Sequence, residues 1–356
     1  MELLKKMYEI HSKSGREKKL KRFIRKWIAE NVPNIKMSND SKGNIYVVKG
    51  ESATYPVVVA HLDQVQNSHS RDFQALEAGD IIIGYSQKSR AQQGLGADDK
   101  NGVWVALQCL LRYDAIKVAL FVSEEIGCIG SDGANMSFFD DARFVLQCDR
   151  RGAHDLITEA GWTDLCSSAF VKAIQPELFG YKEESGMLTD VLTLKEKGLK
   201  VSCVNISCGY YEPHTDHEFT NVPDLMNCLD FVEHIIDTCV DVYPHEYSYS
   251  KSYYGKYYEW EDVPSEPITK NSYDSKSFYA IQSDFYEVYY DVVKEFLEVF
   301  PNASFDELYW YLKESYTDTY FWKDWTQALY NDVLIAIIEN NTVEKVESKQ
   351  DEVVVV

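Results

Sequence analysis

Two adjacent carboxylates follow the apolar run in the stretch VALFVSEEIG at 118–127. Five consecutive apolar residues predict a strand buried on both faces, and Glu124 and Glu125 come just after it. Like charges in such a place are costly to desolvate unless a cation lies nearby. A metal ion supplies that charge, and a carboxylate that does not bind the ion can act as a general base. The stretch is therefore a candidate for part of a metal-dependent active site.

Further polar clusters occupy similar places after predicted strands or a glycine-bounded loop. They are His61-Leu-Asp63, Asp98-Asp99-Lys100, Asp149, and His214 in the segment EPHTDHEF. Each cluster has an ordinary explanation by itself, as a loop hydrogen bond, a helix N-cap or a solvated surface. Together they contain the imidazole nitrogens and carboxylate oxygens that zinc accepts as ligands. The combination favours one metal site over several separate structural roles.

These motifs resemble those of the co-catalytic zinc exopeptidases, a group that includes tripeptidase T, the zinc aminopeptidases, and the related carboxypeptidases and aminoacylases. The resemblance covers about residues 1–240, and the motifs occur in the order typical of the family. The matching segments are His61-Leu-Asp63, Gly96-Ala-Asp98-Asp99-Lys100, Ser123-Glu124-Glu125-Ile-Gly127, Asp149, and His214-Thr-Asp-His-Glu218-Phe219.

The resemblance implies two zinc ions, or two other divalent transition-metal ions, in each chain. His61 and Asp149 would bind one ion, and Glu125 and His214 would bind the other. Asp98 would bridge the two ions, which would then share and acidify one water molecule.

The resemblance also implies roles for residues that do not bind metal. Glu124 would be the general base that takes a proton from the shared water and delivers it to the leaving amine. Asp63 would accept the second ring N–H of His61 and so fix the tautomer that binds metal. Asp99 and Lys100 are expected to cap and begin the following helix rather than to bind metal.

Two assignments stay open at the level of the sequence. His217 lies three residues after His214 and is an alternative metal ligand, although the family pattern His-Ser/Thr-x-x-Glu favours His214. Thr189 and Asp190 open a predicted helix. They are interpreted first as an N-cap and second as pocket residues.

Short apolar runs alternate with helical patterns before residue 240. The sequence predicts strands at 45–48, 57–60, 118–122, 143–147 and 201–206, and helices at 102–111, 164–174, 189–197 and 224–240, with two more helices within 2–31. Continuous apolar strands separated by helices indicate an α/β fold with a mostly parallel central sheet flanked by helices. Ligands of such sheets bind beyond the carboxyl ends of the strands, where the polar clusters occur.

The composition changes near Tyr243. Seven of the sixteen residues at 243–258 are tyrosine, and amphipathic helical patterns follow. The predicted organisation is a catalytic domain at 1–242, a Tyr-rich arm or linker at 243–275, a small helical appendage at 276–340 and a tail at 341–356. Because aromatic residues are enriched at interfaces, the Tyr-rich region is a candidate surface for contact with another protein.

The spacing of the last two ligand motifs predicts a fold without a lid. Tripeptidase T and the aminoacylases insert a lid or dimerisation domain there, whereas only 64 residues separate Asp149 from His214 in this chain. The architecture therefore resembles that of the lidless zinc aminopeptidases, while the residues of the motifs are closer to those of tripeptidase T.

The overall composition excludes several kinds of partner. The chain has 356 residues with 36 basic and 57 acidic side chains, which gives a formal net charge of −21. This charge repels phosphate backbones and anionic lipids, so neither nucleic acid nor a membrane surface is an expected partner. The N-terminus has no signal-peptide or spanning pattern, and a cytoplasmic location is expected. The eight cysteines are expected to be reduced and buried.

The sequence thus predicts a hydrolase that cleaves a terminal amide bond of short peptides. An aminopeptidase is favoured, because a rim of surplus carboxylates would attract the free α-amino group. One alternative is an N-acyl amino acid or dipeptide amidohydrolase with the same activation of water. Another is a non-catalytic relative that binds peptides or proteins, but neither a metal ligand nor the base is missing from the motifs.

Overall fold

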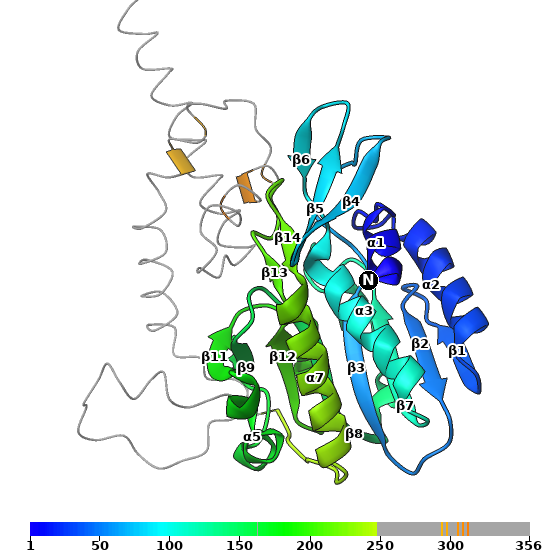
Figure 1. Cartoon of the computed structure of the whole chain (residues 1–356). Coiled ribbons are helices and arrows are strands. Elements are labelled where there is room, and N and C mark those ends of the chain that lie inside the picture. The colour runs from blue at the N-terminus through cyan, green and yellow to red at the C-terminus, as the bar shows by residue number, and fades with distance from the viewer. Residues whose placement is uncertain are drawn as a thin grey trace, which may run out of the picture. The chain divides into compact units, whose positions relative to one another are not determined.

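The computed structural model describes residues 1–161, 163–247 and a few positions between 293 and 312 (Figure 1). The chain divides into two compact units, Met1–Glu259 and Trp260–Val356. The sequence predicted a Tyr-rich arm, a helical appendage and a tail. These segments lie outside the described residues, except for residues 243–247 and those few positions. The description below concerns the first unit.

Nine strands of the described residues form the central sheet, in the order β1-β2-β7-β3-β8-β12-β9-β10 with β11 beside β9. Their bounds are β1 Ile35–Asn39, β2 Ile45–Lys49, β3 Tyr55–His61, β7 Ile116–Phe121, β8 Ala142–Arg150, β9 Asp155–Ala160, β10 Thr163–Asp164, β11 Lys182–Gly186 and β12 Cys203–Ser207. The four central strands β7, β3, β8 and β12 are parallel to one another, while β2 and β9 pair with them antiparallel. The prediction of a mostly parallel central sheet is confirmed.

Helices cover both faces of this sheet, which explains why its strands are continuously apolar. Along β3, Val58 faces one core cluster and its neighbours Val57 and Val59 face the other, since successive side chains point to opposite sides. One face carries α1 Glu2–Tyr8, α2 Lys18–Asn31, α3 Ala97–Arg112, α5 Ser168–Ile174 and α7 Val222–Thr238 (Figure 1). The other face carries α6 Asp190–Glu196 and the 3-10 turn η1 Met136–Phe139, and α4 Ile129–Asp132 packs beside α6.

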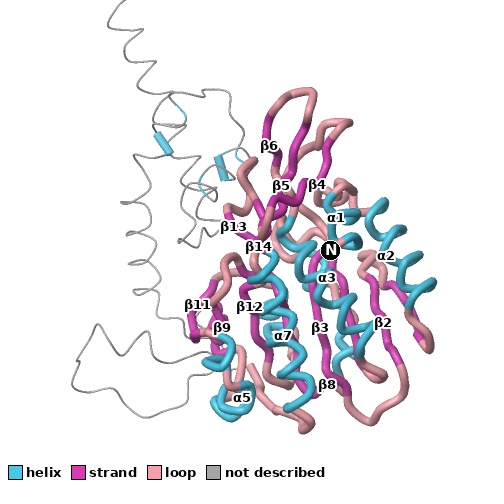
Figure 2. Tube along the Cα trace, viewed as in Figure 1, coloured by secondary structure: helices cyan, strands magenta, loops and turns pink. Residues whose placement is uncertain are grey.

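A second, smaller sheet lies beside the central one (Figure 2). Its strands are β4 Phe73–Ala78, β5 Ile81–Ser86, β6 Ala91–Gln93, β13 Tyr210–Tyr211 and β14 Phe219–Asn221. The sequence predicted none of these strands. They are short, and β4 and β5 alternate between buried and less buried residues, so they lack the apolar runs that identify the central strands. β14 joins β5 by pairing Phe219 with Ile83 across 136 positions of sequence.

No lid domain interrupts the first unit. The residues between Asp149 and His214 form β9 to β13 together with α5 and α6, and these elements belong to the two sheets or pack against them. The prediction of a lidless fold is therefore confirmed for the described residues.

All eight cysteines are buried and free, as the sequence predicted. Among the helices of the described residues, none combines the length and apolar character needed to span a membrane.

Candidate metal centre

The register of the parallel strands brings two predicted ligands level with each other. Val59 of β3 lies opposite Gln147 of β8, so His61 and Asp149, each two residues further along, share the same face at the same end of the sheet. His61 also lies opposite Phe121, the last residue of β7. The loop that carries Glu124 therefore begins beside His61.

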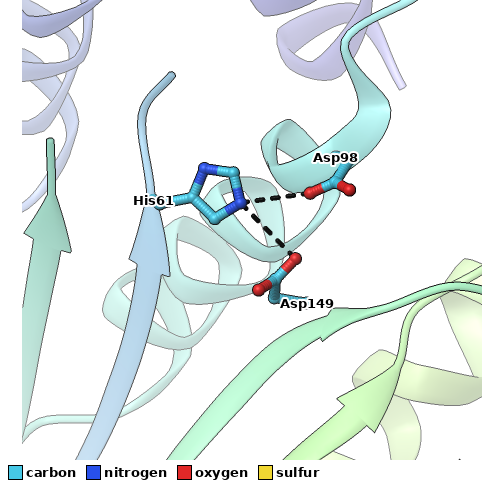
Figure 3. A group of neighbouring side chains, drawn as sticks. All are labelled: His61, Asp98 and Asp149. Carbon is cyan, nitrogen blue, oxygen red and sulfur yellow. Dashed lines mark hydrogen bonds and ion pairs between the residues drawn. The ribbon is translucent and has the colours of Figure 1, made fainter. Parts of the chain in front are cut away.

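Two carboxylates meet the same ring nitrogen of His61. Its Nε2 lies 3.1 Å from Asp98 Oδ1 and 3.5 Å from Asp149 Oδ1 (Figure 3). The His61 side chain is only 1% exposed, and the two carboxylates reach it from α3 and β8. One imidazole and two carboxylates thus form a first group with the composition of a metal site.

A second group shares Asp98 with the first. The other carboxylate oxygen of Asp98, Oδ2, lies 3.3 Å from His214 Nε2, and that nitrogen lies 3.1 Å from Glu125 Oε2. The ligand atoms within each group lie within 4.8 Å of one another. The two oxygens of Asp98 are therefore divided between two groups, each with one imidazole and one further carboxylate.

Glu124 and Glu125 point to different neighbours. Glu125 meets His214, whereas Glu124 Oε2 lies 3.9 Å from His61 Nε2 and Glu124 Oε1 accepts a hydrogen bond from Cys128 Sγ at 3.3 Å. Glu124 is thus next to both groups without being a member of either.

The electrostatics of the cluster call for additional positive charge. Burial raises the pKa values of Glu124, Glu125 and Asp149 above their ordinary range, and neighbouring carboxylates add to the effect. Burial alone would lower the pKa of His61, but Asp149 and the other carboxylates raise it well above its ordinary value. The cluster is therefore too rich in negative charge to be stable with all its carboxylates ionised and no cation.

The donor atoms fit a divalent metal ion. Glu125 Oε1 is buried and has no hydrogen-bond partner among the described residues. An unsatisfied carboxylate oxygen of this kind costs free energy unless a cation takes it up. Imidazole nitrogen with carboxylate oxygen is a donor set that zinc and other transition metals accept.

Asp63 connects both sides of the cluster. Its Oδ1 lies 3.5 Å from His61 Nδ1, which is too long for a well-formed hydrogen bond. It also accepts the backbone N–H groups of Glu124 at 2.9 Å and Glu125 at 3.2 Å, and the Ser14 hydroxyl at 2.7 Å. Asp63 thus orients the loop after β7, which the sequence did not predict, while its predicted hydrogen bond to the His61 ring stays a prediction.

Asp99 caps the helix that follows Asp98, as expected. Its Oδ1 accepts the backbone N–H of Gly102 at 2.9 Å, and its Oδ2 accepts that of His61 at 3.1 Å. Lys100 is fully buried and donates to Gln64 Oε1. Neither residue belongs to a metal-site group.

Thr189 is the N-cap residue of α6, as the sequence predicted, but its side chain does not cap the helix. Helix α6 begins at Asp190, and Thr189 makes no side-chain cap hydrogen bond. Gln147 Oε1 takes that role instead, because it accepts the N–H of Val191 at 3.1 Å and the Thr189 hydroxyl at 2.7 Å. Asp190 is buried and accepts a hydrogen bond from Ser131, and burial raises the pKa of Asp190 to about 6.

His214 and His217 have different surroundings. His214 adopts a φ of +65° in the loop between β13 and β14, and its Nε2 faces Asp98 and Glu125. Both histidines are exposed, the side chain of His214 to 53%, but among the described residues His217 belongs to neither candidate group.

Glu218 braces the backbone at Asp98, a contact that the sequence did not predict. Its two oxygens accept the N–H groups of Gly96 at 2.6 Å and Asp98 at 3.0 Å. The side chain is fully buried, and burial raises the pKa of Glu218 to about 7. The neighbouring residue Asp216 accepts the N–H of Gly94 at 3.1 Å. The second sheet therefore holds the loop of Asp98 against the loop of His214.

Asn205 fixes the backbone of Asp149 in a similar way. Its Oδ1 accepts the N–H of Asp149 at 2.9 Å, and its Nδ2 donates to the Asp149 carbonyl at 2.9 Å. Gln147 Nε2 also donates to Asp149 Oδ2 at 3.0 Å. An Asn within an apolar strand was the only signal of this role in the sequence.

We expect Glu218→Gln to weaken metal binding by about 10–100-fold without unfolding the protein, because Glu218 holds the backbone of the proposed ligand Asp98. An amide can accept only through one oxygen, so one of the two backbone N–H groups loses its partner. Metal affinity is measured by competition with a chromophoric chelator. The exposed Glu177→Gln is the control and should bind metal like the unmodified protein. Equal affinity of the Glu218→Gln variant would contradict the bracing role.

Comparisons with known proteins give a match in structure but not in sequence. No protein-family model matches the chain. No curated protein matches it either. The aminopeptidase PepT from Bacillus cereus ATCC 10987 is similar with a TM-score of 0.54 at 12% identity, over 67% of this chain and 98% of that one.

Two further solved structures show the same likeness. A tripeptidase from Staphylococcus aureus subsp. aureus Mu50 has a TM-score of 0.53 at 13% identity, over 65% of this chain and 95% of that one. An aminopeptidase from the archaeon Desulfurococcus kamchatkensis has a TM-score of 0.53 at 17% identity, over 68% of this chain and 94% of that one. The chain therefore has the α/β fold of these peptidases, and this is the fold that its motifs predicted.

Proposed function

We propose that the protein is a metallo-exopeptidase that uses two divalent ions, zinc in the first instance, to release the N-terminal residue of short peptides. The observation that carries this proposal is the position of Asp98. Its Oδ1 lies 3.1 Å from His61 and its Oδ2 lies 3.3 Å from His214. A carboxylate shared in this way would hold two neighbouring ions at once.

The other ligands follow from the two groups. His61 and Asp149 would hold one ion, and Glu125 and His214 would hold the other. Two such ions would polarise the scissile carbonyl and lower the pKa of a water molecule between them. The two groups need no rearrangement of the chain for these roles, since their ligand atoms already lie within 4.8 Å of one another.

Glu124 is the proposed general base. It is 12% exposed, lies next to His61, and belongs to neither ligand group. Its carboxylate would take a proton from the water molecule and pass it to the leaving amine. Asp63 keeps this base in place, because it accepts the backbone N–H of Glu124 at 2.9 Å.

Cleavage at the N-terminal end is favoured by charge. The free α-ammonium group of a peptide is attracted by carboxylates, and Glu124 and Asp190 remain in the cluster beyond the proposed ligands. Two of the structures with the same fold are named as aminopeptidases and one as a tripeptidase.

A panel of free-amine, N-blocked and C-blocked dipeptides and tripeptides, assayed with and without chelator, tests the proposal. We expect hydrolysis of the free-amine peptides only, no hydrolysis after chelation, and recovery when zinc is added back. Hydrolysis of the N-blocked peptides would point to an N-acyl amino acid amidohydrolase. Full activity of a metal-free preparation would contradict the mechanism altogether.

A further inference from the structure

A basic groove lies beside the candidate metal centre. Its volume is about 620 Å³, which falls within the usual range of about 300–1,000 Å³ for ligand sites. Five basic side chains line it: Lys18, Lys21, Arg22, Arg25 and Lys42. Glu17 is the one acidic residue in its wall. The groove is therefore a concentration of positive charge in a chain whose net charge is −21.

The groove is connected to the metal centre through two of its wall residues. Ser123 lines the groove and directly precedes Glu124. Gly15 lines it as well, and the preceding residue Ser14 donates a hydrogen bond to Asp63 Oδ2 at 2.7 Å. The groove therefore begins one residue away from Glu124 in the chain and one residue away from a partner of Asp63.

The edge of the groove that contains Gly15 and Ser123 is well fixed. Glu17 is buried, and its Oε1 accepts hydrogen bonds from the backbone N–H of Gly15 at 2.8 Å and that of Ser123 at 3.2 Å. This carboxylate is thus used within the wall and is turned toward the backbone.

Most of the basic side chains have no anionic partner. Within the described part of the chain, Lys18, Lys21, Arg22 and Lys42 form no ion pair, and Arg25 donates to the neutral side chain of Asn39. Lys21 is only partly exposed, and this burial lowers its pKa from the ordinary value, while Glu17 and Asp40 offset part of the effect. An anionic group in the groove would offset the mutual repulsion of these charges.

We propose that this groove binds acidic side chains in the part of the peptide that follows the scissile bond, so that the substrates are peptides with Asp or Glu several residues after the N-terminus. The proposal rests on the proposed function. In an aminopeptidase, the α-ammonium group lies at the metal centre, and the remainder of the peptide leads away from it toward Ser123 and the groove.

The test compares two pentapeptide amides, Leu-Gly-Gly-Glu-Glu and Leu-Gly-Gly-Gln-Gln, as substrates of the zinc-loaded protein. We expect kcat/KM to be about fivefold to tenfold higher for the acidic peptide, in keeping with a few partly exposed charge pairs. Added salt should reduce this ratio.

Two matched variants locate the preference. Lys21→Gln combined with Arg22→Gln should bring the ratio of the two kcat/KM values close to one. Lys19→Gln combined with Lys26→Gln changes the same net charge on the same helix outside the groove, and should keep the ratio of the unmodified protein. An acidic preference that survives in the groove variant, or a ratio of one in the unmodified protein, would overturn the proposal.

Direct binding separates this proposal from the proposed function. The acidic peptide amide carries a fluorophore at its C-terminal end, and its anisotropy is measured with each protein. Absence of hydrolysis together with binding that the groove variant weakens would leave the groove as a site for acidic peptides and reject the peptidase. Hydrolysis of both peptides with equal kcat/KM would support the peptidase and reject the groove as a site for acidic peptides.

Discussion

Glu124→Gln should lower kcat by about 10²–10⁴-fold and leave the metal content unchanged. The substitution keeps the size of the side chain and removes its ability to take a proton. Because Glu124 belongs to neither ligand group, binding of the ions should not depend on its charge. Steady-state kinetics gives kcat, and elemental analysis of the dialysed protein gives the number of ions per chain.

The exposed Glu177→Gln serves as the control for this measurement and should retain the kinetics of the unmodified protein. If Glu124→Gln instead turned over with an unchanged kcat, another group would have to be the base. If it lost its metal, Glu124 would be a metal ligand, and the roles proposed for Glu124 and Glu125 would have to be exchanged.

Asp98→Asn should affect both ions at once. Its carboxylate faces His61 with one oxygen and His214 with the other, and an amide offers one oxygen and a donor that opposes a cation. Changing a residue that only hydrogen-bonds a metal ligand typically lowers metal affinity by roughly 10–100-fold. We expect Asp98→Asn to lower it by more than that and to make hydrolysis undetectable. Equilibrium dialysis against zinc followed by elemental analysis measures the loss.

The stability of the same variant distinguishes a metal ligand from a structural residue. His61 and His214 hold the pKa of Asp98 below its usual range, so the metal-free Asp98→Asn variant should unfold at a lower Tm than the metal-free unmodified protein. Added zinc should raise the Tm of the unmodified protein far more than that of the variant. Asp230→Asn on the exposed side of α7 is the control for the change of charge. A variant that binds two zinc ions tightly would rule out the bridging role.

The sequence predicted the central strands because their signal is local. Each run of apolar residues is buried from both sides by helices, so every position along β3 and β7 is buried, and residues 57–60 and 118–121 are apolar without alternation. The cap at Asp99 was predictable for the same reason, since its partner Gly102 is three residues away. Helix α5 shows the limit of such signals: it begins at Ser168, and Asp164, where a helix was predicted to start, lies in β10.

The second sheet shows what local patterns miss. β14 contains three residues and has no apolar run, yet it pairs with β5 and so fixes the two ends of the loop that carries His214. Glu218 and the backbone of Asp98 are 120 positions apart, so their hydrogen bond has no signature in either segment. The role of Gln147 in capping α6 across 44 positions was hidden in the same way.

The sequence by itself determined the types of residue at the centre, and it placed His61, Glu125 and Asp149 at or just after the ends of central strands. It could do so because motifs and apolar runs are properties of contiguous residues. Only the tertiary structure decided that Asp98 turns one oxygen to His61 and the other to His214, that Glu218 holds its backbone, and that a basic groove begins beside Ser123. These features depend on distances between side chains far apart in the chain, and such distances are fixed by strand register and packing.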